Sequence, residues 1–259
     1  MKKSFWISLI AVTAIGLIVI VPGFLRATKK YPANTDAPGW SGTSNGGDAK
    51  GTVTEEGIAL AIVYDTSGSM GENVSDRASG NEAKFRIANR ALTAIVDRLQ
   101  AFVEAAPANT QRKLGTGLVV FNNDSPEVAV KFGPFKSAAL REWLKRYSSP
   151  RGGTPLSKSL RVAGQAVLRS SLTKKHVLVV TDGMNTDGTD PATVMKELQA
   201  EAANKKTMLS VYFVAFDITD KVFDSVKNVS AIVVSAADAK QLDAQLEFIL
   251  TEKILLEAE

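Results

Sequence analysis

The sequence contains no cysteine and only one histidine among its 259 residues. Without cysteine the chain can form no disulfide, build no zinc knuckle and perform no thiol chemistry, although this absence is compatible with any compartment. The one histidine, His176, stands at the start of an expected strand, where a structural or surface role is favoured. A Ser-His-Asp triad needs a histidine beside its nucleophile, so the sequence excludes that kind of enzyme.

Signatures of several other functional classes are missing as well. The formal net charge of +4 is weak for a nucleic-acid binder, and no basic stripe interleaves with aromatic residues, so we expect no nucleic-acid partner. There is no G-x-x-x-x-G-K-[ST] phosphate-binding loop and no internal repeat. What the chain does have, 45% hydrophobic and 22% charged residues, is typical of a globular protein with a substantial core.

A continuous apolar run, Ile58–Tyr64, ends abruptly at Asp65. The run is rich in β-branched residues, which is typical of a strand buried on both faces in a parallel sheet. Ser67 and Ser69 follow, with Gly68 between them to let the chain turn tightly. Open α/β sheets bind ligands just beyond the carboxyl ends of their strands, so these three oxygen-bearing side chains are placed to form a site.

Two more segments bring oxygen-bearing side chains to similar positions. Residues 152–155 carry the Thr154 hydroxyl on a tight turn that opens a helix, and a second buried strand, Val177–Thr181, ends at Asp182. Oxygen ligands without cysteine or histidine suit Mg²⁺ or Mn²⁺ rather than zinc. The alternative is that the two aspartates only cap the turns after their strands. The predicted metal-site residues are Asp65, Ser67, Ser69, Thr154 and Asp182.

The pattern D-x-S-x-S, followed by a distant threonine and a distant aspartate, resembles the metal ion-dependent adhesion site (MIDAS) of the von Willebrand factor A (vWA) domain family. The resemblance covers Gly57 to about Ala236 or beyond, which is most of the chain, and all five motif positions match. It implies that the residues from the first loop ligate or orient Mg²⁺, with Mn²⁺ or Ca²⁺ as other ions. It also implies that Thr154 coordinates the ion directly in the ligand-ready state, and that Asp182 acts directly or through water. The remaining coordination position would then take an acidic side chain of a protein partner.

Apolar runs and helical patterns alternate along the chain, which predicts an α/β fold. We expect a doubly wound, Rossmann-like, mostly parallel central sheet with helices on both faces and one short antiparallel edge strand. Strands are expected at 58–64, 114–121, 127–131, 177–181, 208–216 and 231–234. Helices are expected at 85–102, 138–147 and 221–227 and after residues 154, 191 and 239. The last helix has one apolar side, which is typical of a layer of the core, and the resemblance to the vWA family implies the alternative that it shifts with the metal site.

A charge-free apolar run, Phe5–Leu25, is long enough to cross a bilayer as a helix, with a cleaved signal peptide as the alternative. The sequence therefore predicts a transmembrane anchor at 1–26, a flexible polar linker at 27–56 and a vWA domain at 57–259. This division predicts a single-pass membrane protein with its N-terminus inside and its vWA domain periplasmic or extracellular.

Three smaller features have open interpretations. Gly71–Asn81 forms either part of a partner-binding rim or a solvated loop of no consequence. Arg151, beside the Thr154 turn, either contacts an acidic ligand or is a solvated surface charge. Ser171–Lys174 has the S-x-x-K spelling, but we expect it in a turn before a strand rather than on a helix, so catalysis is not expected there.

The predicted function is metal-dependent protein binding, in adhesion or in the assembly of a complex, and not catalysis. Hydroxyls and waters neutralise little of a cation's charge, so an incoming carboxylate gains a strong interaction. One alternative is a phosphoryl-transfer enzyme with Asp65 as nucleophile, although haloacid-dehalogenase-like phosphatases normally need a second Asp where this chain has Ser67. The other is a scaffold whose metal site is purely structural. The sequence leaves the partner and the oligomeric state open.

Overall fold

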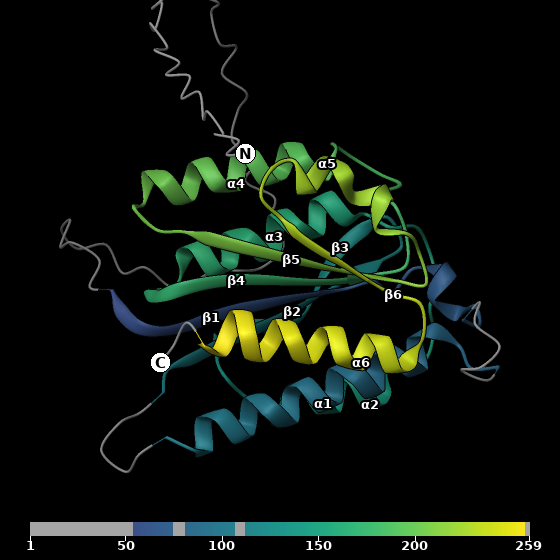
Figure 1. Ribbon diagram of the computed structural model, residues 1–259, viewed down its shortest axis with the longest axis horizontal. Coiled ribbons are helices and arrows are strands. Elements are labelled where there is room, and N and C mark those ends of the chain that lie inside the picture. Colours follow the sequence, from purple (N-terminus) through teal and green to yellow (C-terminus); the bar gives the residue numbers. More distant parts are fainter. Residues whose placement is uncertain (1–53, 75–80, 107–111, 257–259) are drawn as a thin grey trace, which may run out of the picture. The chain divides into compact units, whose positions relative to one another are not determined.

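The computed structural model describes residues 54–74, 81–106 and 112–256 (Figure 1). The strands are β1 (Glu55–Tyr64), β2 (Leu114–Asn122), β3 (Ser125–Pro134), β4 (Leu172–Thr181), β5 (Leu209–Phe216) and β6 (Ile232–Ala236). The helices are α1 (Lys84–Glu104), α2 (Ser137–Arg146), α3 (Leu156–Arg169), α4 (Pro191–Asn204), α5 (Asp224–Lys227) and α6 (Ala239–Phe248). Short 3₁₀ turns lie at Gly68–Gly71 and Asp220–Phe223, and a π-helical segment, Ile249–Leu255, continues α6.

The six strands form one sheet in the order β3-β2-β1-β4-β5-β6. β3 runs antiparallel to β2, and the other neighbouring strands are parallel. From β1 the chain first builds outward through β2 and β3, then returns to the other side of β1 with β4. The strand order therefore reverses between β1 and β4, and this switch point is where open α/β sheets bind ligands.

The predicted fold class is confirmed: a mostly parallel α/β sheet with helices around it and one antiparallel edge strand. The edge strand is longer than expected, however, since β3 has ten residues and matches β1 in length. Its side chains are exposed or half-buried, so it lacks the continuous apolar run that marks the central strands.

The core lies on both faces of the sheet, because successive side chains of a strand point to opposite faces. Figure 1 shows α1, α2 and α6 on one face and α3, α4 and α5 on the other. Buried β1 side chains on the first face are Ile58, Leu60, Ile62 and Tyr64, and those on the second are Ala59, Ala61 and Val63. This burial on both faces explains why β1 reads as an uninterrupted apolar run.

The C-terminal helix packs on the first face with its predicted apolar side. Five residues of α6 and its π-helical continuation are buried in the same cluster as β1: Leu242, Leu246, Ile249, Leu250 and Ile254. Asp238 caps the helix by accepting a hydrogen bond from the backbone N–H of Gln241 at 2.7 Å.

The fourth strand begins earlier than its sequence indicates. β4 starts at Leu172 because Leu172 pairs with Glu55 at the start of β1, so most of Ser171–Lys174 is strand and not turn. The polar residues at 173–175 conceal this extension in the sequence. His176 consequently lies inside β4, buried, with its ring stacked 6.0 Å from the ring of Tyr212.

The predicted membrane topology needs correction. Within 54–74, 81–106 and 112–256, no helix combines the length and the apolar character needed to cross a bilayer. The longest, α1, buries one face against the sheet and carries charged residues on the other. This finding contradicts the prediction of a single-pass membrane protein, which we withdraw. The run Phe5–Leu25 and the predicted boundary after residue 26 lie outside the described residues.

Candidate metal centre

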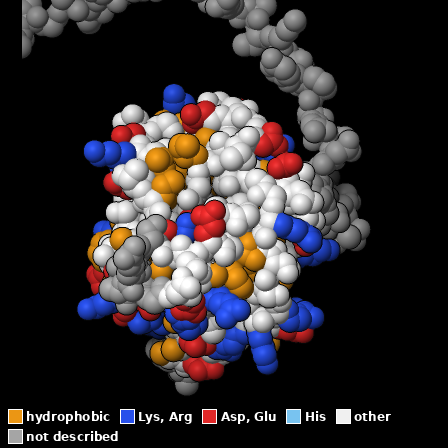
Figure 2. Space-filling model, turned by 90° about the vertical axis from the view of Figure 1, so that its right-hand side faces the viewer, with side chains coloured by type: hydrophobic (Ala, Val, Ile, Leu, Met, Phe, Trp, Pro, Cys, Tyr) orange, Lys and Arg blue, Asp and Glu red, His pale blue; other side chains and the backbone are white. Residues whose placement is uncertain are grey.

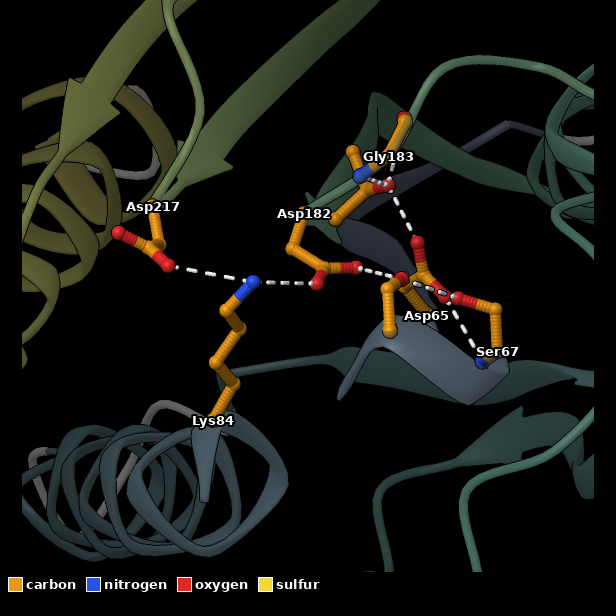
Figure 3. A network of polar contacts seen from close by, with 8 residues as sticks. Asp65, Ser67, Lys84, Asp182, Gly183 and Asp217 are labelled. Atoms are coloured by element: carbon orange, nitrogen blue, oxygen red, sulfur yellow. Dashed lines mark hydrogen bonds and ion pairs between the residues drawn. The ribbon is translucent and has the colours of Figure 1, made fainter. Parts of the chain in front are cut away.

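The carboxyl ends of β1 and β4 lie side by side in the middle of the sheet. Tyr64 pairs with Val180, and the backbone N–H of the next residue, Asp65, donates to the Val180 carbonyl at 2.9 Å. Asp182 follows β4 directly, just as Asp65 follows β1. The register of the two strands therefore brings two aspartates, 117 positions apart in numbering, to one edge of the sheet (Figure 3).

A chain of hydrogen bonds links the first loop to Asp182. The Asp65 carboxylate accepts from the Ser67 backbone N–H at 2.9 Å and from the Thr181 hydroxyl at 2.5 Å. The Ser67 and Ser69 hydroxyl oxygens are 3.1 Å apart, and Ser69 donates to Asp182 Oδ1 at 2.8 Å. The 3₁₀ turn that starts at Gly68 holds both serine hydroxyls toward the carboxylates.

Thr154 reaches the same place from the turn before α3. At Gly152 the backbone φ is +76°, and a Cβ there would lie 2.4 Å from the Asn123 Cα, so only glycine fits this turn. The buried Thr154 hydroxyl lies against the backbone after β4: a Cβ on Gly183 would be 3.2 Å from Thr154 Oγ1 and 3.9 Å from Asp65 Oδ2. The structure thus brings all five sequence-predicted residues together.

The electrostatics of the site are dominated by two buried carboxylates close to each other. Burial, together with the nearby negative charge of Asp182, raises the pKa of Asp65 to about 6, against the opposing effect of its hydrogen bonds from Ser67 and Thr181. In the part of the chain that the structure describes, no three histidine, cysteine or acidic side chains gather into a metal-binding group. The donor set here is instead two carboxylates and three hydroxyls, which fits a hard divalent cation that keeps part of its water shell.

Sequence reasoning missed two residues of this network, Lys84 and Asp217. The Lys84 ammonium lies between two carboxylates, 3.0 Å from Asp182 Oδ2 and 3.1 Å from Asp217 Oδ2 (Figure 3). Burial alone would lower the pKa of Lys84, but the hydrogen bonds and charges of the two aspartates outweigh it and raise the pKa. A signal was available: like the other two aspartates, Asp217 directly follows a buried strand, here β5.

A second set of contacts fixes the backbone of the first loop from the α2 side. The Thr66 carbonyl accepts from the Tyr147 hydroxyl at 3.2 Å and from the Arg151 backbone N–H at 3.0 Å. These three residues, with Trp143, line a pocket of about 260 Å³ beside the candidate site. Arg151 is exposed there, as either of its two sequence interpretations requires.

The face around the site is mixed in character. Figure 2, which looks onto the right-hand side of Figure 1, shows a red acidic patch beside a blue basic one near the middle, with apolar side chains above and below. Of the predicted rim Gly71–Asn81, residues 75–80 lie outside the described residues, whereas Asn73 pairs with Ala83 in an isolated β-bridge.

Solved structures with the same fold include a minor pilin, a domain of a pilus tip protein and a protein of the mussel byssus. The PilB minor pilin from Streptococcus sanguinis is 13% identical (TM-score 0.59), with coverage of 79% of this chain and 62% of that one. The vWF domain of the type V pili tip protein Mfa5 from Porphyromonas gingivalis is also 13% identical (TM-score 0.55), with coverage of 76% of this chain and 96% of that one. Proximal thread matrix protein 1 from the mussel byssus, with a zinc-occupied MIDAS motif, is 16% identical (TM-score 0.53), with coverage of 76% of this chain and 48% of that one.

These likenesses show the fold, and this chain spans less than two thirds of the length of the pilin. No curated protein sequence matches the chain. Residues 59–247, more than half of the chain, match the von Willebrand factor type A domain. The chain therefore belongs to the von Willebrand factor type A domain family, a family of metal-dependent adhesion and protein-binding modules.

Proposed function

We propose that this protein is a metal-dependent protein-binding module that captures an acidic side chain of a partner through a divalent cation. The observation that carries the proposal is the convergence of two buried carboxylates and three hydroxyls at the switch point of the sheet. The negative charge of Asp182 raises the pKa of Asp65, so a cation held by both carboxylates would be favourable, and turn capping alone would not bring these carboxylates together.

Mg²⁺ is the ion we propose, with Mn²⁺ or Ca²⁺ as substitutes, and the five predicted residues would hold it. When bound, the cation supplies a coordination position whose charge is only partly neutralised, and a carboxylate from the partner can fill it. The protein's own groups hold that geometry: Thr181 and the Ser67 backbone orient Asp65, while Ser69 orients Asp182.

The partner is proposed to be a protein with an exposed acidic residue. Arg151 lies exposed in the pocket beside the loop that follows β1, and its backbone N–H donates to the Thr66 carbonyl of that loop. Its positive charge therefore favours a partner with further negative charge. Among the structures with this fold are a pilus tip protein and a byssus protein with a metal in its MIDAS motif. Both are consistent with the proposed adhesive or assembly role.

A binding role explains the site better than phosphoryl transfer does. The groups that hydrogen-bond to the Asp65 carboxylate are the Ser67 amide and the Thr181 hydroxyl, and neither is a general acid or base for phosphoryl transfer. Ser67 stands where a dehalogenase-like phosphatase would carry its second aspartate. A phosphatase activity that disappears in Asp65→Ala would overturn this reading.

Calorimetric titration of the full chain with Mg²⁺ and Mn²⁺ tests the metal site. We expect weak binding to the wild type and none to Asp65→Ala, because that substitution removes one of only two carboxylates. The matched control is Asp97→Ala, which removes an exposed carboxylate paired with Arg141 on the outside of α1 and should bind as the wild type does. A folded wild type that binds neither ion would refute the proposal, as would an Asp65→Ala variant with normal binding.

A further inference from the structure

Three neighbouring strands of the sheet each end at an aspartate. Asp65, Asp182 and Asp217 directly follow β1, β4 and β5, which are adjacent in the sheet. The first two belong to the candidate metal centre, and the third points toward them from the β5 side (Figure 3). Between Asp182 and Asp217 lies the ammonium group of Lys84.

The buried position of Lys84 would destabilise the protein without its two carboxylate partners. Its side chain is only 8% exposed, and a buried ammonium loses hydration that only well-placed partners can replace. It is also the first residue of α1, where the helix dipole disfavours a positive charge. Two carboxylates at 3.0 and 3.1 Å compensate for both effects.

The two oxygens of the Asp182 carboxylate have different hydrogen-bond donors. Asp182 Oδ2 accepts from Lys84, while Oδ1 accepts from the Ser69 hydroxyl and faces the metal loop. A divalent cation held by Asp182 would therefore share this carboxylate with an ammonium group. The two positive charges repel each other through a partly dehydrated region, where charge interactions are stronger than in bulk water.

We propose that Lys84 is a resident counter-cation of the metal centre. It joins Asp182 to Asp217, keeps the carboxylates together when no divalent ion is bound, and weakens the binding of that ion so that it exchanges readily. The inference rests on the proposed function, because it concerns the affinity of the same site. Asp217 then contributes to the electrostatics of the metal centre through Lys84, although Asp217 matches no position of the motif.

The test compares Mn²⁺ affinity and metal-free stability in two variants of the full chain. Lys84→Met keeps most of the side-chain length but removes the charge. Because charges interact more strongly in a buried site than in water, we expect Mn²⁺ to bind roughly tenfold more tightly or better. The same variant should unfold at a lower temperature in EDTA. Asp217→Asn leaves the ammonium to Asp182 alone, so Mn²⁺ should bind several-fold more weakly.

Arg90→Met is the matched control. Arg90 also lies on α1, but it pairs with Glu82 at the surface, so its removal changes the net charge equally without touching the site. We expect Mn²⁺ affinity and stability in EDTA to stay close to wild type. Equal gains in Arg90→Met and Lys84→Met would mean that net charge alone is responsible, which would overturn the inference.

The outcomes separate this inference from the proposed function. A wild type that binds no Mn²⁺ contradicts the proposed function itself. A wild type that binds Mn²⁺, together with a folded Lys84→Met of unchanged or weaker affinity, contradicts only the role of Lys84. Should Lys84→Met fail to fold, Asp217→Asn decides alone: unchanged or tighter Mn²⁺ binding overturns the inference, because the ammonium would then not compete with the ion for Asp182.

Discussion

At the scale of single residues, the polar groups inside this protein are of two kinds. Asp65, Asp182 and Lys84 are buried where opposite charges and hydroxyls meet them at the carboxyl edge of the sheet. His176 is buried elsewhere, within β4, with its ring stacked on Tyr212. The two aspartates are proposed to bind a cation beside Lys84, whereas His176 packs inside the sheet and affects how stability depends on pH.

We predict that His176 makes the protein less stable in mild acid. Burial, aided by the nearby charge of Lys174, lowers the pKa of His176 from 6.5 to about 4. Between pH 6.5 and 4 the unfolded chain binds a proton that the folded protein does not, so the free energy of unfolding falls as the pH falls. The loss over this window is on the order of 3 kcal/mol at most, at about 1.4 kcal/mol per pH unit.

Urea unfolding from pH 7 to 4 measures this effect in the wild type and in His176→Gln. Both proteins lose stability as their carboxylates titrate, so the difference between their slopes is the quantity to compare. The variant should show the shallower dependence between pH 6.5 and 4. Parallel curves would mean that His176 becomes protonated in the folded protein without cost.

At the scale of elements, the last helix connects to the site through the sheet. The backbone N–H of Asp217 donates to the Ala236 carbonyl at 2.7 Å, at the end of β6, and α6 begins three residues later at Ala239. Ile249 lies further along, fully buried in the core beside β1. This geometry favours a core role for the helix and leaves the predicted shift with the metal site as a hypothesis.

Ile249→Ala distinguishes the two roles of the helix. Loss of a buried isoleucine should lower the free energy of unfolding by about 2–4 kcal/mol, as large-to-small core substitutions do. Ile232→Ala on β6 is the control. Because Ile232 is 41% exposed, its substitution should lower the free energy of unfolding by well under half as much. Unchanged Mg²⁺ affinity in folded Ile249→Ala supports the core role. A changed affinity would show that the helix and the metal site are coupled, because coupling between sites is reciprocal.

At the scale of the whole molecule, the strand order determines where function can lie. The reversal between β1 and β4 opens the carboxyl edge of the sheet at its centre, and loops from both halves of the chain meet there. Figure 1 shows helices on both faces of the sheet. The apolar side chains of the sheet are buried beneath them, which leaves this edge for polar contacts. A cation at that point would join the loops after β1 and β4 and the turn before α3.

Mg²⁺ should therefore stabilise the whole domain. A ligand that binds only the folded state adds about 2.7 kcal/mol at a hundred times its Kd, which raises the unfolding temperature by several degrees for a domain of this size. Thermal unfolding in saturating Mg²⁺ and in EDTA measures the shift, with Asp65→Ala as the control that should show none. A purely structural metal site would give the same shift, but partner binding would then be unaffected by EDTA in a protein that stays folded.

The sequence by itself determined the central part of the fold and the five candidate ligands. Buried parallel strands carry continuous apolar runs, and an oxygen-bearing residue that follows such a run must lie at the carboxyl edge of the sheet. Local spacing is enough to show this for Asp65, Ser67, Ser69 and Asp182, whereas Thr154 was predicted from its tight turn before a helix and from its match to the motif. The apolar side of the last helix could also be predicted from the sequence, because apolar residues at a period of 3.6 mark the side of a helix that faces the core.

Tertiary structure alone decided the length of β4, the length of the edge strand β3 and the pairing of Lys84. Polar residues at the start of β4 become strand only because β1 lies beside them, and β3 is long because β2 pairs with it. Lys84 and Asp182 lie 98 positions apart, and no local pattern encodes their contact. That contact depends on where α1 begins relative to the ends of β4 and β5, a relation set by the packing of the helix on the sheet.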